Sequence, residues 1–279
     1  MDSRTPAEIL AYTSDTGLAK AQRSIPAVMI LAFLAGAFVA FASEGSNMAA
    51  YNLLAGSDSY GLGRVMAGTV FGAALMMILL AGGELFTGNM LIIVSVLDRR
   101  VKARRMFLNW ILVYAGNLAG SLFIAWMMYH SGLFNSSGGL LGGITIKIAA
   151  SKALLPFHSA FLLGLMCNWL VCLAVWASYG AREFAGKILA IFFIILLFVT
   201  SGFEHSVANM YYIPAGILAR HNPQWLAMSG LSPQQLAGLT WYGFAVKNLI
   251  PVTLGNIAGG AGMVGVLYWL SLGKRKKAD

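Results

Sequence analysis

The sequence predicts an all-α integral membrane protein with six transmembrane helices. Of its 279 residues, 58% are hydrophobic and only 10% are charged, which leaves too little polar surface for a water-soluble domain. A spanning helix needs about 20 predominantly apolar residues, and the chain contains six runs of sufficient length. These runs lie at about 28–50, 67–97, 107–129, 157–179, 187–219 and 242–271.

The polar segment 1–24 precedes the first span and is expected to form a cytoplasmic, amphipathic N-terminal helix. Thr5, Pro6 and Glu8 match a capping box with proline at the first helical position. We expect the helix to reach about Lys20 and to lie along the membrane surface, the alternative being a frayed tail. The first apolar run is too long, and lacks the small-residue cleavage site, for a cleaved secretory signal.

The formal charge of +9 is explained by topology and does not indicate a nucleic-acid partner. Basic residues gather in alternate connections, so the positive-inside rule predicts a multi-pass membrane protein with both termini in the cytoplasm. We expect the membrane to be the cell (inner) membrane. The expected parts are a channel domain over 25–272 and a basic cytoplasmic tail over 273–279. The 14 of 19 Lys and Arg residues assigned to the cytoplasmic side are Arg4, Lys20, Arg23, Arg99, Arg100, Lys102, Arg104, Arg105, Arg182, Lys187, Lys274, Arg275, Lys276 and Lys277.

The two cysteines, Cys167 and Cys172, are expected to be packing residues. Their spacing places them about 140° apart around a helix, which is poor geometry for a shared metal ion or a disulfide. We therefore expect no metal site and no cofactor.

The two halves of the chain contain matching motifs in the same order, which indicates two copies of a three-span unit at about 25–130 and 155–272. Because three is odd, the second copy enters the membrane from the opposite side, and we expect the substrate path along the resulting pseudo-twofold axis. The matches pair residues 33–36 with 161–164, residues 83–90 with 202–210, and Asn109 and Asn117 with Asn248 and Asn256.

Spans two and five are each interrupted by a polar, glycine-containing segment, at 82–89 and 201–206. Irregular backbone at membrane depth is tolerated where it is buried in protein or lines a wet cavity, so the two breaks indicate a pore. Ionisable groups at this depth, here Glu84, Glu204 and His205, cost several kcal/mol unless paired or hydrated. Glycines in membrane helices can alternatively serve to let two helices cross closely, and that role suits a different set of glycines. These are Gly116, Gly120, Gly255, Gly259 and Gly260.

Three signatures give the chain a resemblance to a known family. They are Leu85 to Gly88, Cys167 to Trp176 and Ser201 to Met210, with Lys152 and the pair Gly255-Asn256 also fitting. Over residues 5–272 the chain resembles the formate/nitrite transporter family of formate, nitrite and hydrosulfide channels.

The resemblance implies an aquaporin-like protomer, a homopentamer and a separate pore in each protomer. It implies a movable loop at Leu85, Phe86 and Thr87, and polar residues between two constrictions. It places Phe71, Leu75 and Leu85, with Phe86 from the same loop, at the cytoplasmic constriction; Val171 and Phe198 at the periplasmic one; Thr87, Asn168 and His205 between them; and Asn89, Asn209, Asn117 and Asn256 as loop and packing support.

The chemistry of three residues agrees with an anion path. Lys152 is expected to draw anions toward a vestibule, although an interfacial lysine that anchors its helix is the alternative. His205 can donate a hydrogen bond when neutral and a proton when charged, which suits an anion that must cross dewetted apolar rings as a neutral acid. The alternative for His205 is a core residue bonded to backbone. Glu204 is expected to point away and to hold the loop in shape.

Other classes of protein fit less well. An aquaporin-type neutral solute channel would carry Asn-Pro-Ala at both half-helices, whereas the sole Asn-Pro pair is Asn222-Pro223 in a loop. An intramembrane hydrolase would need a converging nucleophile and base, so we expect no enzyme. The expected partners are membrane lipids and a small monovalent anion. Phe203 and the run 210–214 look more like those of formate channels than of nitrite channels, so the resemblance favours formate, with nitrite and hydrosulfide as alternatives.

Overall fold

The computed structural model describes residues 3–273, and within them six helices are long and apolar enough to cross a membrane. The predicted fold class and the six predicted spans are confirmed. The predicted basic tail lies outside the described residues except for Gly273. The six spans are Ile25–Ala55 (α2), Tyr60–Gly82 (α3 with a π-helical end), Ala103–His130 (α5), Phe157–Gly180 (α7), Phe184–Ser201 (α8) and Gly243–Leu272 (α12 and α13 with flanking π-helical turns).

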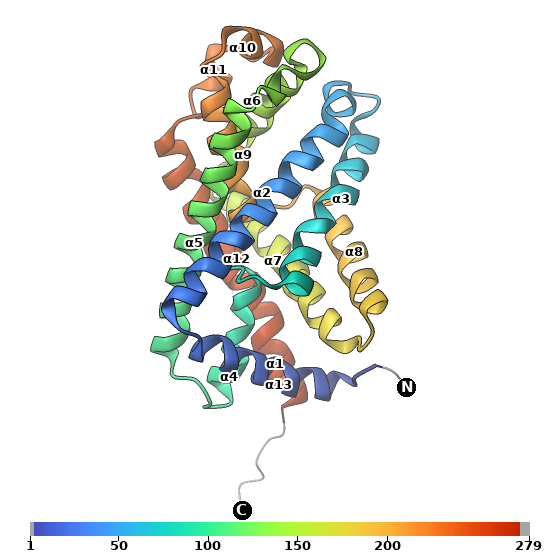
Figure 1. Ribbon diagram of the computed structural model, residues 1–279, viewed down its shortest axis with the longest axis vertical. Coiled ribbons are helices and arrows are strands. Elements are labelled where there is room, and N and C mark those ends of the chain that lie inside the picture. Colours follow the sequence, from blue (N-terminus) through green and yellow to red (C-terminus); the bar gives the residue numbers. More distant parts are fainter. Residues whose placement is uncertain (1–2, 274–279) are drawn as a thin grey trace, which may run out of the picture.

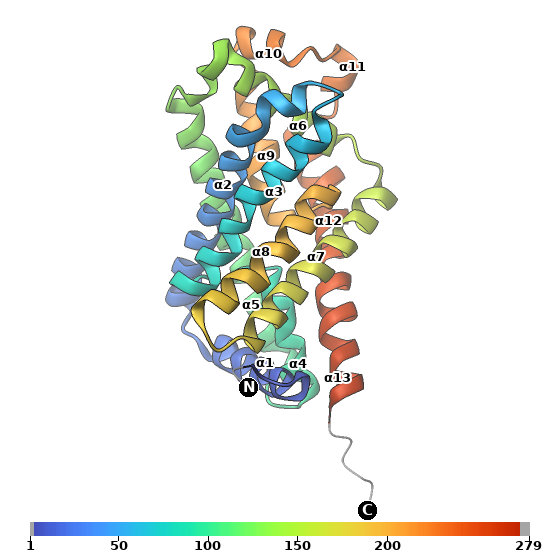
Figure 2. The same ribbon diagram turned by 90° about the vertical axis from the view of Figure 1, so that its right-hand side faces the viewer.

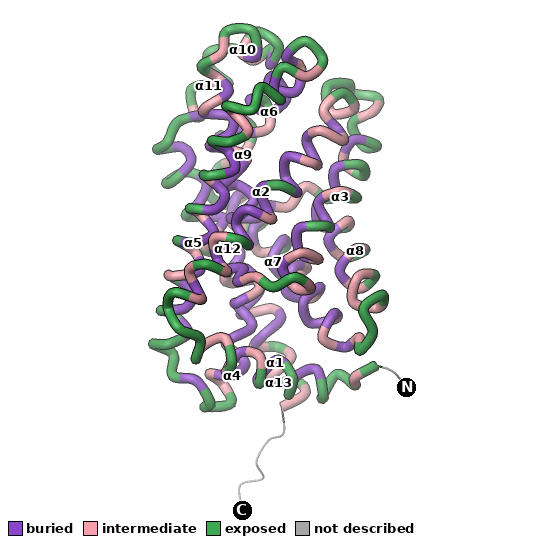
Figure 3. The backbone as a smooth tube through the Cα atoms, viewed as in Figure 1, coloured by how far each residue is buried: buried purple, intermediate pink, exposed green. Residues whose placement is uncertain are grey.

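Shorter helices complete the bundle at its ends and at the two breaks (Figures 1 and 2). The short α10 and α11 cover one end, and α1 crosses the other end, where α13 also finishes. Figure 3 shows the buried segments through the middle of the bundle and the exposed ones mainly at its ends. Within the regions named above, α3 covers Tyr60–Met76, α12 Ile250–Ile257 and α13 Leu267–Leu272; the shorter helices are α1 (Pro6–Gln22), α4 (Ile92–Leu97, after a 3-10 turn Gly88–Leu91), α6 (Leu140–Ala153, after a 3-10 segment Leu133–Gly139), α9 (Ser206–Ala219), α10 (Pro223–Ser229) and α11 (Pro233–Leu236).

The N-terminal helix α1 is fixed at its start by the expected capping box. The Thr5 hydroxyl accepts a hydrogen bond from the Glu8 amide at 3.3 Å, and the Glu8 carboxylate accepts one from the Thr5 amide at 2.7 Å. The Thr5 hydrogen bonds lower the pKa of Glu8. One face of α1 is buried against α4 and α7, and Ser95 donates a hydrogen bond to the Ser14 carbonyl at 2.7 Å. The helix therefore packs directly on the end of the bundle. The prediction had placed it along the membrane surface without specifying such contacts.

The second and fifth spans break where the sequence places glycine and glutamate. The π-helical end of α3 finishes at Gly82, whose φ of 101° lies in the left-handed region that favours glycine. The chain is then irregular until Gly88, where a 3-10 turn leads into α4. Likewise α8 ends before Gly202, with φ of 83°, and α9 begins at Ser206. Each break exposes backbone groups inside the bundle.

Small residues bring the first and third span of each half into backbone contact. A Cβ atom on Gly120 would lie 2.0 Å from the Phe33 carbonyl oxygen, and one on Gly259 would lie 2.1 Å from the Leu165 carbonyl oxygen. Glycine is therefore required at both crossings, as small residues are at many membrane helix interfaces.

The hydrogen bonds at the breaks correct one part of the predicted repeat. The Glu84 amide donates to the Leu31 carbonyl at 3.1 Å, and the Glu204 amide donates to the Leu163 carbonyl at 3.2 Å. Leu31 is thus equivalent to Leu163. Gly164 therefore corresponds to Ala32, which lies one helical turn before Gly36. The sequence pairing of 33–36 with 161–164 was displaced by that turn, because apolar helices rich in Ala, Gly and Leu align almost equally well in either register.

Candidate pore and its polar centre

Thr87 and His205, one from each break, meet in the middle of the bundle. The Thr87 hydroxyl lies 2.8 Å from His205 Nε2, and both residues are buried. His205 is also the N-cap of α9, where its Nδ1 accepts a hydrogen bond from the Ala208 amide at 3.1 Å. Because Nδ1 accepts, the neutral ring carries its proton on Nε2 and donates it toward Thr87. His205 therefore presents a hydrogen-bond donor at the point where the breaks meet.

Two buried asparagines satisfy the backbone of the breaks in the same way. Asn117 donates to the carbonyls of Ala32 (2.8 Å) and Glu84 (2.9 Å) and accepts from the Phe86 amide at 2.9 Å. Asn256 does the same in the other half. It donates to the carbonyls of Gly164 (2.8 Å) and Glu204 (3.0 Å) and accepts from the Ser206 amide at 2.9 Å. Each side-chain amide thus hydrogen-bonds two backbone groups at a break and one carbonyl of the first span of that half.

Asn168, which is buried in α7, joins the first break to α12. Its amide donates to the Thr87 carbonyl at 3.2 Å and to the Asn256 carbonyl at 2.6 Å. The Cys172 thiol donates to the same Thr87 carbonyl at 3.2 Å, so this cysteine also supports the loop. Cys167 and Cys172 are both free and buried, and no group of metal-ligating side chains occurs within residues 3–273.

Glu84 is the centre of a charged cluster at the end of the bundle where α1 lies. It pairs with Lys20 at 3.0 Å and with Arg23, and it accepts a hydrogen bond from the Asn89 amide at 2.7 Å. Asn89 in turn accepts from Lys20 at 2.7 Å and donates to Asn109 at 2.8 Å. The buried carboxylate is thus paired and hydrogen-bonded, which offsets the cost of placing it in a span.

Glu204 is the centre of the corresponding cluster in the other half. It pairs with Lys152 at 2.8 Å and accepts from the Asn209 amide at 2.7 Å. Asn209 also donates to Asn248 at 2.8 Å, and Asn248 donates to the Lys152 carbonyl at 2.9 Å. Lys152 ends α6 as Lys20 ends α1, so a short helix before the first span supplies the cation in each half.

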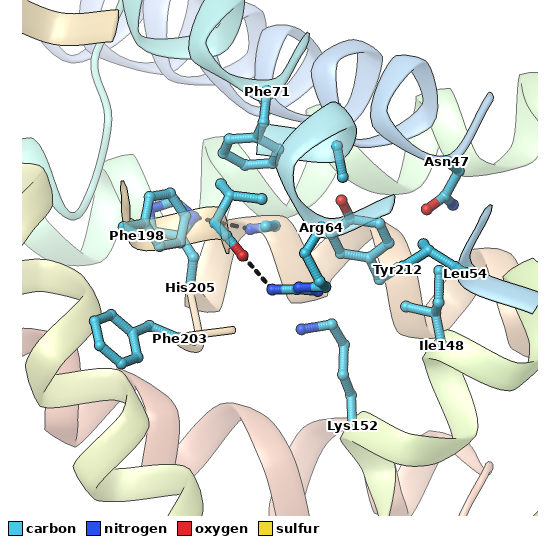
Figure 4. Close-up of a pocket in the computed structure, with 13 residues that line it drawn as sticks. Asn47, Leu54, Arg64, Phe71, Ile148, Lys152, Phe198, Phe203, His205 and Tyr212 are labelled. Atoms are coloured by element: carbon cyan, nitrogen blue, oxygen red, sulfur yellow. Dashed lines mark hydrogen bonds between the residues drawn. The ribbon is translucent and has the colours of Figure 1, made fainter. Parts of the chain in front are cut away.

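A vestibule leads from Lys152 toward His205 (Figure 4). Arg64 and Lys152 point into it from opposite sides, and Arg64 also donates to the carbonyls of Val199 and Thr200 at the end of α8. Arg64 and Lys152 together outweigh Glu204, the carboxylate that pairs with Lys152, and the remaining positive charge raises the local concentration of small anions. Asn47 lies on the wall, and its side-chain amide nitrogen has no hydrogen-bond partner among the described residues.

The inner end of this vestibule is apolar. The rings of Phe71 and Phe198 are in edge contact with centroids 5.6 Å apart, and Phe198 lies 6.1 Å from the His205 ring. The prediction that Phe71 lies at the opposite constriction from Phe198 is therefore wrong. The cause is the antiparallel packing of α3 and α8, in which Gly68 faces Leu196 and Thr200, so that Phe71 one turn later lies beside the end of α8.

The other predicted constriction residues, Leu75, Leu85 and Val171, are all buried. Phe86 is buried too, but its ring packs edge-on against Tyr114 of α5 at 4.8 Å and lines an outer groove between α5 and α12. The structure thus gives Phe86 a packing partner on α5 and places it apart from the Phe71 and Phe198 pair.

Sequence reasoning missed Arg64, Asn47 and Glu44. Glu44 is buried in α2 and accepts a hydrogen bond from Tyr211. The signal for Glu44 was present, since it is a carboxylate within an apolar run like Glu84 and Glu204. Arg64 gave little signal because a single arginine near the end of a span is usually an interfacial anchor.

A six-span bundle with two interrupted helices, a polar centre and an apolar ring pair defines a membrane channel or transporter for a small solute. Comparison with known proteins identifies its family. The family model described as formate/nitrite transporter matches residues 7–270, and the chain belongs to that family.

Related proteins match the chain over most of their length. The chain is 39% identical to the formate channel FocA of Haemophilus influenzae, with 94% of this chain and 92% of the relative covered. It is 35% identical to FocA of Escherichia coli K12, with 96% and 94% covered. A solved pentameric formate channel with formate bound superposes with a TM-score of 0.79 at 36% identity, covering 88% of this chain and 97% of that one.

The pairing of Lys152 with a buried carboxylate predicts an asymmetric response to mutation. We expect Lys152→Met to destabilise the folded protein by about 3–5 kcal/mol, because it leaves Glu204 buried without its cation. Adding Glu204→Gln should recover most of that loss, since a neutral amide still accepts hydrogen bonds. Thermal unfolding in detergent measures both. A double variant as unstable as Lys152→Met alone would show that the ion pair does not account for the loss.

Proposed function

We propose that the chain conducts formate across the cell inner membrane as a homopentamer with one pore in each protomer. The observation that carries the proposal is the hydrogen bond between Thr87 and His205, at the junction of the two breaks and next to a vestibule with two cationic side chains. The formate channels among the relatives and the pentameric solved structure support the substrate and the assembly.

The vestibule and the apolar pair suggest how a weak-acid anion would be handled. Lys152 and Arg64 attract the anion, while the Phe71 and Phe198 rings disfavour a hydrated charge. An oxygen of formate would then take the place of Thr87 as acceptor from His205 Nε2. Formate is small, planar and singly charged, so one such donor satisfies one of its oxygens.

We propose that His205 can also give its proton to formate. In the structure Nδ1 accepts from the Ala208 amide, so a proton bound at Nδ1 must displace that cap. The charged ring would then release the Nε2 proton to a formate oxygen, leaving formic acid and a neutral ring protonated at Nδ1. More protons outside favour the first step, so uptake should rise as external pH falls.

The ends of the bundle support a direction across the membrane. Helix α1 and the end of α13 lie at the same end of the molecule, as an even number of spans requires. Most Lys and Arg residues of the described chain lie at this end, in or next to α1 and around the α4–α5 and α7–α8 connections, and we propose that it faces the cytoplasm.

The direct experiment is solute flux into proteoliposomes. We expect formate to pass, with nitrite and other small monovalent anions passing less well, because the pore offers one donor between apolar rings. Stopped-flow measurement with each anion at matched concentration gives the order. Passage of water or ammonium without any anion flux would contradict the proposal, and faster nitrite or hydrosulfide than formate would reassign the substrate within the family.

His205→Asn tests the proton step. The amide keeps a hydrogen-bond donor of similar size but cannot exchange a proton, so formate uptake should lose most of its increase at low external pH. His221→Asn is the matched control, because His221 is exposed at the end of α9. Uptake is measured over an external pH series in both variants. A wild-type pH profile in His205→Asn would make His205 a polar lining residue alone.

A further inference from the structure

A crevice outside the pore opens where α1 ends and where α2 and α5 begin. These three segments lie together at one edge of the bundle (Figure 1). Its lining combines cationic side chains with apolar ones. The residues that matter here are Lys20, Arg23, Arg105, Ile25, Leu108 and Leu112.

Three cations line the crevice, and two of them share a single carboxylate. Glu84 pairs with Lys20 and Arg23 from the inner side, whereas Arg105 is exposed and its side chain makes no hydrogen bond or ion pair within residues 3–273. The crevice therefore has an excess of positive charge. Such an excess next to a membrane attracts anions from the lipid surface.

The cations also retain unused donors. Lys20 spends one donor on Glu84 and one on Asn89, which leaves the third of its ammonium protons. Arg23 contacts Glu84 through one terminal nitrogen, and 37% of its side chain is exposed. Lysine and arginine donors in this arrangement suit the oxygens of a phosphate group.

The rest of the crevice is apolar and continues along the membrane-facing surface. Ile25 is 54% exposed and Leu108 is 48% exposed, and both stand near the start of spanning helices. The adjoining face of α5 carries further exposed apolar side chains, Phe107 and Ile111. A free anion would leave these surfaces uncovered, whereas an acyl chain attached to the anion would cover them.

We infer that this crevice binds an anionic phospholipid of the leaflet on the side of α1, with its phosphate between Arg105, Arg23 and Lys20 and an acyl chain along α5. The inference does not depend on which solute the pore conducts. Because Lys20 and Arg23 also hold Glu84, the bound lipid would contact the same side chains that fix the break of span two.

Titration with lipid, followed by native mass spectrometry of the intact oligomer, tests the site. Phosphatidylglycerol should bind several-fold more tightly than phosphatidylcholine with the same acyl chains. Arg105→Gln should weaken phosphatidylglycerol binding about fivefold, the effect of one basic residue at a lipid surface. Arg104→Gln is the matched control, because Arg104 is exposed in the same turn but does not line the crevice.

Three binding results would overturn the inference. They are equal binding of the two lipids by the wild type, equal losses in the two arginine variants, and displacement of phosphatidylglycerol by inorganic phosphate at comparable concentration, which would indicate a site for free anions. If Arg105→Gln dissociates the oligomer and leaves lipid preference intact, the crevice is an interface between protomers and the lipid site is excluded.

Discussion

The structure depends on satisfying the backbone groups that two broken helices leave inside the membrane. Each unpaired amide or carbonyl at that depth costs several kcal/mol, so neither break can exist without fixed partners. Asn117 and Asn256 make three hydrogen bonds each, one to a carbonyl in the first span of the same half and two to backbone groups at the break. With the backbone satisfied by these amides, Thr87 and His205 remain available to each other and to a solute.

The two ends of the protomer repeat one electrostatic arrangement. A glutamate at the break is held by an asparagine from its own span and by a lysine from a short helix that precedes the repeat. The cost of a buried carboxylate is offset only when its partners are in place, so α1 and α6 are part of the fold of each half. This explains why α1 is docked on the bundle and is not simply laid on the lipid surface. It also places Lys152 beside the vestibule that leads toward His205.

Much of the architecture could be predicted because it is a property of single segments. Span length, the glycine and glutamate residues at the breaks and the basic connections are all local signals, and they indicated the spans correctly. Relations between segments were less predictable. The placement of Phe71 with Phe198 depends on how α3 and α8 pack, and the register of α2 against α7 depends on backbone hydrogen bonds at the breaks. Arg64 is held beside the vestibule by a hydrogen bond to a carbonyl at the end of α8, and the sequence does not indicate that this carbonyl is available.

The central claim is that Thr87 and His205, one from each break, act as a unit on the permeating anion. A double-mutant cycle tests it most directly, with initial formate flux into proteoliposomes measured at one pH for the wild type, Thr87→Val, His205→Asn and the double variant. If the hydrogen bond between them forms the conducting centre, the double variant should be no slower than the slower single variant, because the first change already removes the shared interaction. Losses that simply multiply would show that the two residues act independently, and the claim would be wrong.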